Sequence, residues 1–142
     1  IKKKVVEKDE KETALRKVLN FGHTFAHAYE ASLGYSNKLN HGEAVILGMK
    51  TALSFSFKKN MLSKNEYNLI INHIDNSTLP SSIKKYFSIK DLNKILSFMS
   101  KDKKNNSEKI NLVLLKKIGK PIFNLNFNSK KLVLFLKKEL TN

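Results

Sequence analysis

The alternation of apolar and polar positions along the chain predicts several helices and one β-hairpin. Residues 13–33 form one helical pattern between Thr13, a candidate N-cap, and Gly34, a candidate stop. Residues 42–60 predict a second helix that is apolar on nearly every face as far as Phe57. A helix that is apolar all round is typical of a buried position, so we expect this one at the centre of the fold.

Shorter helices are expected in the second half of the chain. Ser63 precedes a helical pattern over residues 64–75, and Glu66 follows three residues later as in a capping box. The segment after it contains a proline, which ends the helix, and residues 81–87 predict one further short helix. Residues 89–99 predict another helix, with a serine and an acidic residue again in the capping-box positions.

The last part of the chain predicts a hairpin and a final helix. The apolar runs 110–115 and 121–127 flank a short polar segment in which Gly119 is the turn residue. Ser129 is the expected N-cap of an amphipathic helix over residues 130–140. The expected fold is therefore mainly α with one small β-hairpin. We found no linker rich in Pro, Gly or Ser that would divide it.

Length and composition support a single folded domain over residues 1–142. Hydrophobic residues make up 41% of the chain, with nine Phe and four Tyr, which is enough for a packed core. The absence of Cys excludes a disulfide scaffold and any thiolate metal site. No apolar run is long enough to cross a membrane. Because the first residue is Ile and not Met, we expect the chain to be part of a longer protein.

The net charge of +15, from 27 basic and 12 acidic residues, raises the possibility of a nucleic-acid partner. However, Arg16 is the only arginine, and arginine is the residue that reads bases and clamps phosphates best. The lysines are also spread along the whole chain. Since Lys, Asn and Ile share A/T-rich codons, a biased base composition explains most of this charge without a polyanionic partner.

One face of the first predicted helix has a different chemistry from the other polar surfaces. On a helical wheel, five polar residues share an arc of about 80°, with apolar residues on the opposite side. The five are Arg16, Asn20, His23, His27 and Glu30. Other polar faces in this chain consist mostly of Lys and Glu, so this stripe indicates a functional site about as readily as a solvated surface.

Three of the four histidines fall within 19 residues of sequence. His23 and His27 have the i, i+4 spacing found in zinc-binding helices, and His41 lies at the expected start of the second helix. Glu43, two residues later, is close enough to orient that imidazole through a hydrogen bond. His73 stands apart and is expected to be an ordinary surface or packed histidine. Without Cys, a metal here would have N and O ligands, which suits a catalytic Zn²⁺.

Three motifs together resemble the 3-dehydroquinate synthase family, within the sugar-phosphate cyclase superfamily. They are ETALRKVLNFGHTFAHAYEASLGY, LNHGEAVILGM and SKDKKNNSEKINLVLLKKIGKP, and they occur in the order found in the family. The resemblance covers most of the chain and implies the helical C-terminal domain of such an enzyme. The family's N-terminal α/β domain, which binds most of the NAD, has no counterpart in this sequence.

The resemblance also implies an activity. Enzymes of this family convert 3-deoxy-D-arabino-heptulosonate 7-phosphate into 3-dehydroquinate and phosphate in the shikimate pathway of aromatic amino acid biosynthesis. They oxidise a hydroxyl with NAD, eliminate phosphate, reduce the ketone again, open the ring and close a carbocycle. The implied cofactors are NAD and Zn²⁺ (or Co²⁺). The resemblance further implies a cytoplasmic homodimer with no nucleic-acid or membrane partner.

Individual site residues follow from matching the family motifs to this sequence. The metal ligands implied are His23 and His41, with a third ligand, a Glu, in the N-terminal domain. His27 is implied to contact the substrate and to help move protons. The remaining implied substrate contacts are Lys2, Arg16, Asn20 and one of the pair Lys103 and Lys104, which is also implied in catalysis. A guanidinium can hold a carboxylate with two hydrogen bonds, whereas lysines offer point charges to anionic oxygens.

Two further readings of the sequence stay open. Another sugar-phosphate cyclase, such as 2-deoxy-scyllo-inosose synthase, would share the same site chemistry with a different product. A Lys-rich nucleic-acid-binding helical domain would instead show strong, salt-dependent binding to DNA or RNA. The chain departs from the family at Ala14 and Ala26, where glycine is usual, and alanine should be tolerated in a helix at both positions. Without the N-terminal Glu and the nucleotide site, the isolated chain is expected to be inactive.

Overall fold

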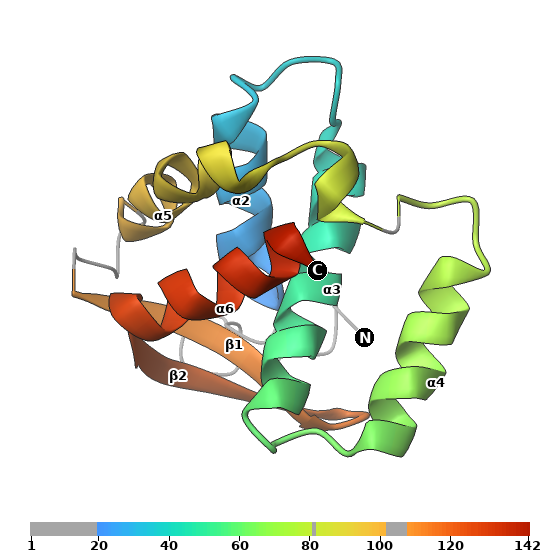
Figure 1. The fold of residues 1–142 in the computed structure, drawn as a ribbon. Coiled ribbons are helices and arrows are strands. Elements are labelled where there is room, and N and C mark those ends of the chain that lie inside the picture. Colours follow the sequence, from blue (N-terminus) through green and yellow to red (C-terminus); the bar gives the residue numbers. More distant parts are fainter. Residues whose placement is uncertain (1–19, 81, 102–107) are drawn as a thin grey trace, which may run out of the picture.

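Helix α3 (His41–Lys58) runs through the middle of the fold, and the other elements are arranged around it (Figure 1). The computed structural model describes residues 20–80, 82–101 and 108–142. In chain order the elements are α2 (His23–Ser32), α3, α4 (Lys64–Asp75), the 3₁₀ turns η2 (Ile83–Lys85) and η3 (Ile89–Asp91), α5 (Leu92–Ser100), β1 (Lys109–Lys117), β2 (Lys120–Asn128) and α6 (Ser129–Thr141). The mainly helical fold with one hairpin, predicted from the sequence, is confirmed.

The central position of α3 follows from its composition, as predicted. Its buried residues include Ala44, Leu53, Ser54 and Ser56, which lie on different faces of the helix. The helix starts at His41 because the Asn40 side chain accepts the Glu43 N–H at 2.8 Å. In return, the Glu43 carboxylate accepts the Asn40 N–H at 3.1 Å, so two free donors of the first turn are satisfied together.

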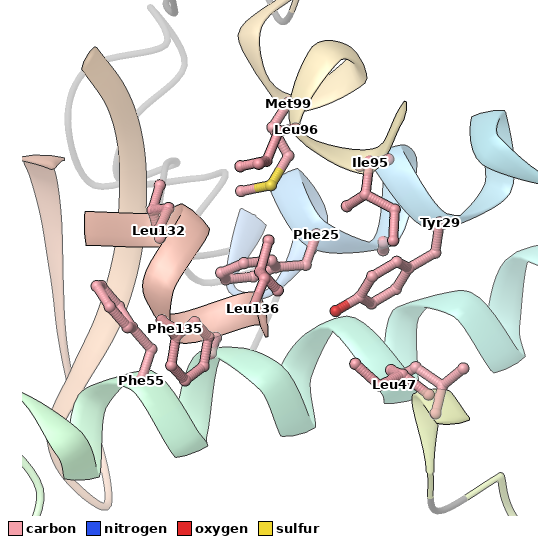
Figure 2. Close-up of a cluster of buried hydrophobic side chains, with 14 of the residues drawn as sticks. Phe25, Tyr29, Leu47, Phe55, Ile95, Leu96, Met99, Leu132, Phe135 and Leu136 are labelled. Carbon is pink, nitrogen blue, oxygen red and sulfur yellow. The ribbon is translucent and has the colours of Figure 1, made fainter. Parts of the chain in front are cut away.

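The main core lies between α3 and three other helices. Figure 2 shows side chains from α2, α3, α5 and α6 meeting in one cluster: Phe25, Tyr29, Leu47, Phe55, Ile95, Leu96, Met99, Leu132, Phe135 and Leu136. The Phe55 ring lies 4.7 Å from the Phe135 ring and 4.9 Å from the Phe127 ring, measured between centroids. Burying one side chain of this size contributes about 1.5–3 kcal/mol, so this cluster fixes the relative positions of the helices.

The expected single helix over residues 13–33 is interrupted, because within the described residues helix α2 begins only at His23. Residues 13–19, with the expected N-cap Thr13, lie outside the described residues. Gly22 precedes α2 with φ +78°, a left-handed conformation that an α-helix does not contain. The cause is tertiary: a Cβ atom on Gly22 would lie only 2.5 Å from the backbone nitrogen of Met49 in α3. The predicted stop at Gly34 is confirmed, since this residue has φ +65° directly after the helix.

The predicted hairpin is confirmed, with Gly119 at φ +84° in the turn between antiparallel β1 and β2. The predicted cap of the last helix is wrong by one residue. Asn128 is the N-cap of α6, and its side-chain oxygen accepts the Lys130 N–H at 2.8 Å. Ser129 lies inside the helix, and its own N–H donates to the Glu108 carbonyl at 2.9 Å, across the base of the hairpin.

The shorter helices were mostly predicted correctly. The Ser63 hydroxyl caps α4 by accepting the Glu66 N–H at 3.2 Å. A complete capping box precedes η3, where the Asp91 carboxylate accepts the Ser88 N–H at 2.8 Å. The segment expected as one helix over 89–99 is in fact one 3₁₀ turn that continues directly as α5.

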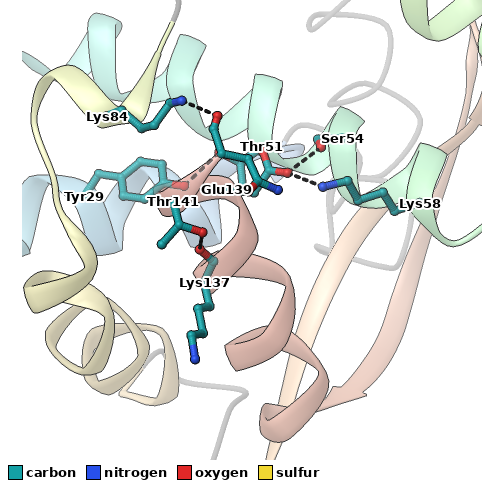
Figure 3. A network of polar contacts seen from close by, with 9 residues as sticks. Tyr29, Thr51, Ser54, Lys58, Lys84, Lys137, Glu139 and Thr141 are labelled. Carbon is teal, nitrogen blue, oxygen red and sulfur yellow. Dashed lines mark hydrogen bonds and ion pairs between the residues drawn. The ribbon is translucent and has the colours of Figure 1, made fainter.

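Polar contacts join the C-terminal helix to the central one, as Figure 3 shows. The Glu139 carboxylate of α6 accepts from Lys58 Nζ at 2.6 Å and from the Ser54 hydroxyl at 3.1 Å, both in α3. Nearby, the Thr51 hydroxyl donates to the Leu47 carbonyl, so it must accept the hydrogen of the buried Tyr29 hydroxyl at 2.7 Å. Within the described ranges, no helix has the length and apolar character needed to cross a membrane.

Candidate metal and substrate site

The face of α2 that points away from the core carries the candidate site. Phe25 and Tyr29 are buried on one side of this helix, while His23, His27 and Glu30 lie on the other. Helices α2 and α3 run in opposite directions, so the start of α3 lies beside the second half of α2 (Figure 1). This antiparallel arrangement brings His41 to the same face.

The three imidazoles converge although His41 lies 14 residues after His27 in the sequence. The ring centroids of His23 and His27 are 5.7 Å apart, and those of His23 and His41 are 6.4 Å apart. The His27 and His41 rings are separated by 6.5 Å and lie nearly parallel. Two imidazoles on one tetrahedral Zn²⁺, with Zn–N distances of about 2.0–2.1 Å, would have their centroids roughly 5 Å apart. The observed spacings of 5.7–6.5 Å are therefore somewhat wider than those of two rings on one metal.

The electrostatic environment of His23 suits a metal ligand. Burial lowers its pKa below the ordinary value of 6.5, and the neighbouring His27 and His41 imidazoles lower it further. Backbone groups of Phe21 and Asn20 act in the opposite direction without reversing the effect. His23 is therefore neutral at neutral pH, which is the form that binds metals. Its Nδ1 atom is buried and makes no hydrogen bond to a described side chain.

His41 has a carboxylate partner from the other helix. Its Nδ1 atom lies 3.0 Å from Oε1 of Glu30. The Glu30 side chain is only 12% exposed, whereas that of His41 is 62% exposed. Because an ionised carboxylate only accepts hydrogen bonds, the Nδ1 atom of a neutral His41 carries the proton and Nε2 retains a free lone pair.

The sequence predicts Glu43 as the carboxylate that hydrogen-bonds to the His41 imidazole. In the structure a different residue makes this contact. The Glu43 carboxylate accepts the Asn40 N–H in the capping box of α3. Glu30 contacts the imidazole instead. The signal for Glu30 was present in the sequence, since it shares the polar stripe with His23 and His27, but only the packing of α2 on α3 shows which imidazole it meets.

The described residues do not form a complete metal site by themselves. No group of three His, Cys, Asp or Glu side chains within the described ranges is arranged to hold a metal ion. Two imidazoles on this face would need at least one more ligand from elsewhere. The donor set, neutral imidazole nitrogen without sulfur, fits Zn²⁺ or Co²⁺.

The other candidate residues lie partly inside and partly outside the described ranges. Asn20 is exposed, and its backbone lies close to the His23 ring. His73 is exposed on α4, as expected for a histidine outside the site. Four candidate substrate contacts lie outside the described residues: Lys2, Arg16, Lys103 and Lys104.

Comparison with known proteins places this site in a family. The model of the family described as 3-dehydroquinate synthase C-terminal matches residues 1–105. The chain belongs to this family. The matched segment contains the whole imidazole cluster together with the four candidate contacts that lie outside the described residues. The resemblance stated from the three sequence motifs is thereby confirmed.

Curated relatives agree with this assignment. The chain is 65% identical over 141 residues to the 3-dehydroquinate synthase of Pelagibacter ubique, covering 99% of the chain and 38% of that protein. It is 37% identical over 137 residues to the 3-dehydroquinate synthase of Zymomonas mobilis, covering 96% of the chain and 36% of that protein. The Leptospira interrogans enzyme of the same name is 43% identical over 138 residues. The chain thus spans well under half the length of these relatives.

A solved structure has the same fold. The crystal structure of 2-deoxy-scyllo-inosose synthase complexed with carbaglucose-6-phosphate, NAD⁺ and Co²⁺ matches with a TM-score of 0.75 and 20% sequence identity. The match covers 96% of this chain and 38% of that one. At this level of identity the comparison shows a shared fold. A cavity of about 220 Å³ between α3, α4 and α6 is lined by none of the three clustered imidazoles.

Proposed function

We propose that this chain supplies the metal- and substrate-binding half of a 3-dehydroquinate synthase. The reaction is the conversion of 3-deoxy-D-arabino-heptulosonate 7-phosphate into 3-dehydroquinate and phosphate. The main support for the proposal is that the imidazoles of His23, His27 and His41 lie together, with ring centroids 5.7–6.5 Å apart. All three belong to the segment that matches the family. The 3-dehydroquinate synthase relatives at 37–65% identity support this product over others.

In this proposal, His23 and His41 hold the divalent metal together with one carboxylate from an N-terminal domain. The neutral, partly buried imidazole of His23 needs no deprotonation before it binds. A bound divalent metal would lower the pKa of the substrate hydroxyl and so favour the loss of hydride to NAD. No residue of this chain is assigned to NAD, which the N-terminal domain would hold.

His27 has a different role in this proposal, because the third metal ligand is a carboxylate of the N-terminal domain. The exposed His27 ring lies beside the two proposed ligands and remains available to the substrate. Its centroid lies 5.7 Å from that of His23, so a substrate bound near the metal would be within reach of a ring nitrogen of His27. An imidazole can accept and return a proton near neutral pH, and positioned groups of this kind accelerate reactions about 10²–10⁴-fold. We assign proton transfer and substrate contact to His27.

The cationic candidates complement the charge of the substrate, which carries a carboxylate and a phosphate. Arg16 can hold the carboxylate through two parallel hydrogen bonds. Lys2 and either Lys103 or Lys104 would supply positive charge to the remaining anionic oxygens. Asn20 lies three residues before the start of α2 and can donate a hydrogen bond to the substrate or accept one from it. We expect the complete enzyme to be a cytoplasmic homodimer.

The proposal is tested with the complete protein that contains this chain. Changing His41→Ala should abolish both bound zinc and turnover of the heptulosonate phosphate, while His73→Ala should retain both. Zinc content is measured by mass spectrometry of the metal after dialysis. A His41→Ala protein that keeps one zinc per chain would contradict the assignment.

Product analysis separates the proposed reaction from the related cyclases. The complete protein with NAD and Zn²⁺ should convert the heptulosonate phosphate into 3-dehydroquinate, identified by chromatography against a standard. Formation of 2-deoxy-scyllo-inosose from glucose 6-phosphate would favour the second cyclase instead. Absence of turnover on either substrate, together with salt-dependent DNA binding, would favour the nucleic-acid alternative.

A further inference from the structure

Glu30 occupies a position in α2 where a carboxylate is unfavourable unless it has a specific partner. It lies in the last turn of the helix, at the negative end of the helix dipole. No basic residue in that turn compensates for it. The side chain is also only 12% exposed, so much of its hydration is lost. Both effects raise the free energy of an ionised carboxylate.

Among the residues that the structure describes, Glu30 pairs with the imidazole of His41 from the next helix. The distance of 3.0 Å between Glu30 Oε1 and His41 Nδ1 is that of an ordinary hydrogen bond. The imidazole is 62% exposed and could otherwise rotate freely or carry its proton on either nitrogen. The nearly buried carboxylate thus restrains an exposed ring, which is the arrangement found behind metal-ligating histidines.

Three other acidic residues lie at the starts of helices and, unlike Glu30, stabilise those starts. Glu43, Glu66 and Asp91 lie at the third position of α3, α4 and η3, where an acidic side chain accepts free N–H groups or favours the positive end of the helix. Each stabilises the beginning of its own element. Glu30 has no such use at the end of α2, so helix formation does not explain its presence.

We propose that Glu30 is the positioning residue for His41. It holds the proton on Nδ1 and orients the ring so that Nε2 presents its lone pair to the metal. This inference rests on the proposed function, because it gives Nε2 of His41 a metal to bind. It adds to that function a residue to which the motif spacing assigns no role.

The expected size of the effect follows from the role. Removing the hydrogen-bond partner behind a metal-ligating histidine typically weakens metal binding 10–100-fold without removing a ligand. Glu30→Ala should therefore retain some zinc at high metal concentration, unlike His41→Ala. Glu30→Gln should bind zinc with an affinity between those of the wild-type protein and Glu30→Ala, because its amide oxygen can still accept the Nδ1 proton but without a full negative charge.

Two readouts on the complete protein test this. The first is the zinc dissociation constant, measured by competition with a chromogenic chelator. The second is the tautomer of His41 in the metal-free protein, read from the nitrogen chemical shifts of ¹⁵N-histidine-labelled samples, with His41→Ala to assign the signals. Glu30→Ala should weaken zinc binding 10–100-fold and lose the preference for a proton on Nδ1, and Glu30→Gln should recover part of both.

Two control variants accompany these. Glu66→Gln removes the same charge at the start of α4 and should leave both readouts unchanged. Glu43→Gln tests the carboxylate nearest in sequence to His41 and should leave the tautomer unchanged. Urea unfolding of each variant shows whether the fold persists, and Glu30→Gln, which keeps the shape of the side chain, serves as the test if Glu30→Ala does not fold.

The outcomes separate this inference from the proposed function. If His41→Ala loses zinc but both Glu30 variants keep wild-type zinc affinity and the Nδ1 tautomer, the positioning role is overturned and the proposed function stands. If His41→Ala keeps its zinc, the proposed metal-binding function is overturned. The positioning role of Glu30, which depends on that function, is overturned with it. A Glu30→Ala protein that only unfolds more easily, with both readouts unchanged, would show that Glu30 is a structural clamp between α2 and α3.

Discussion

A Cβ atom added to Gly48 would lie 2.3 Å from the carbonyl oxygen of Gly22. The two glycines therefore meet backbone to backbone where the start of α2 crosses α3. No side chain can separate the helices at this point. This close approach holds His23, the residue directly after Gly22, at a fixed depth relative to α3, and so it links the packing of the fold to the geometry of the imidazole cluster.

Substituting Gly48→Ala should destabilise the fold, because the new methyl group meets backbone atoms that cannot move aside as a flexible side chain could. It would also lie 2.8 Å from the backbone nitrogen of Ala26. Overpacking of this kind typically costs about 1–3 kcal/mol, measured here as the free energy of unfolding in urea.

Gly42→Ala is the matched control for this variant. A Cβ atom at Gly42 would lie 3.6 Å from the Asn40 side-chain oxygen, an ordinary contact, and the position is helical. Alanine is the better helix former, so stability should stay the same or rise slightly. Equal losses of stability in both variants would mean that the crossing of α2 and α3 is looser than described.

Ser56→Ala should weaken the attachment of the hairpin to α3. Ser56 is fully buried, and its hydroxyl accepts the N–H of Leu115 in β1 at 3.0 Å. It also donates to the Ala52 carbonyl at 2.7 Å. Removing the hydroxyl leaves the Leu115 N–H without this acceptor, at a cost of about 1–3 kcal/mol in the free energy of unfolding. Ser100→Ala, which removes only a bond to the carbonyl of its own helix, should cost clearly less.

His23 should make the metal-free protein less stable in mild acid. Its pKa is lowered in the folded state, chiefly by burial, so below about pH 6.5 the unfolded chain binds more protons than the folded one. Stability is therefore highest above pH 6.5 and falls as the pH drops toward the folded pKa. Urea unfolding between about pH 8 and about pH 5 measures this slope.

The corresponding variants identify the residue responsible. His23→Asn should flatten the dependence, and the exposed His73→Asn should not change it. A slope that persists unchanged in His23→Asn would assign the effect to another group.

The proposed division of roles between His23 and His27 predicts different losses on substitution. His23→Ala should abolish zinc binding and turnover together in the complete protein. His27→Asn should keep one zinc per chain and lower kcat about 10²–10⁴-fold, as expected when a proton-transfer group is removed. Loss of zinc from His27→Asn would move this residue from proton transfer to metal ligation.

The helices with their own local signals were predictable from sequence. The stop at Gly34, the Ser63 cap of α4 and the turn at Gly119 depend on backbone groups within a few residues, and all three were predicted correctly. The buried position of α3 also followed from its composition. The cap of α6 was misplaced by one residue because Asn128 and Ser129 are both good cap residues, and the hairpin decided between them by engaging the Ser129 N–H.

The sequence by itself determined the family motifs, the imidazole-bearing face of α2 and the absence of sulfur ligands, because these depend on residue types and short spacings. Only the tertiary structure decided that α2 begins after Gly22, since the break results from contact with α3, some 26 residues away. It also decided that Glu30 and not Glu43 contacts His41. Proximity in sequence favoured Glu43, but the antiparallel packing of two helices brings Glu30 within hydrogen-bond distance of His41.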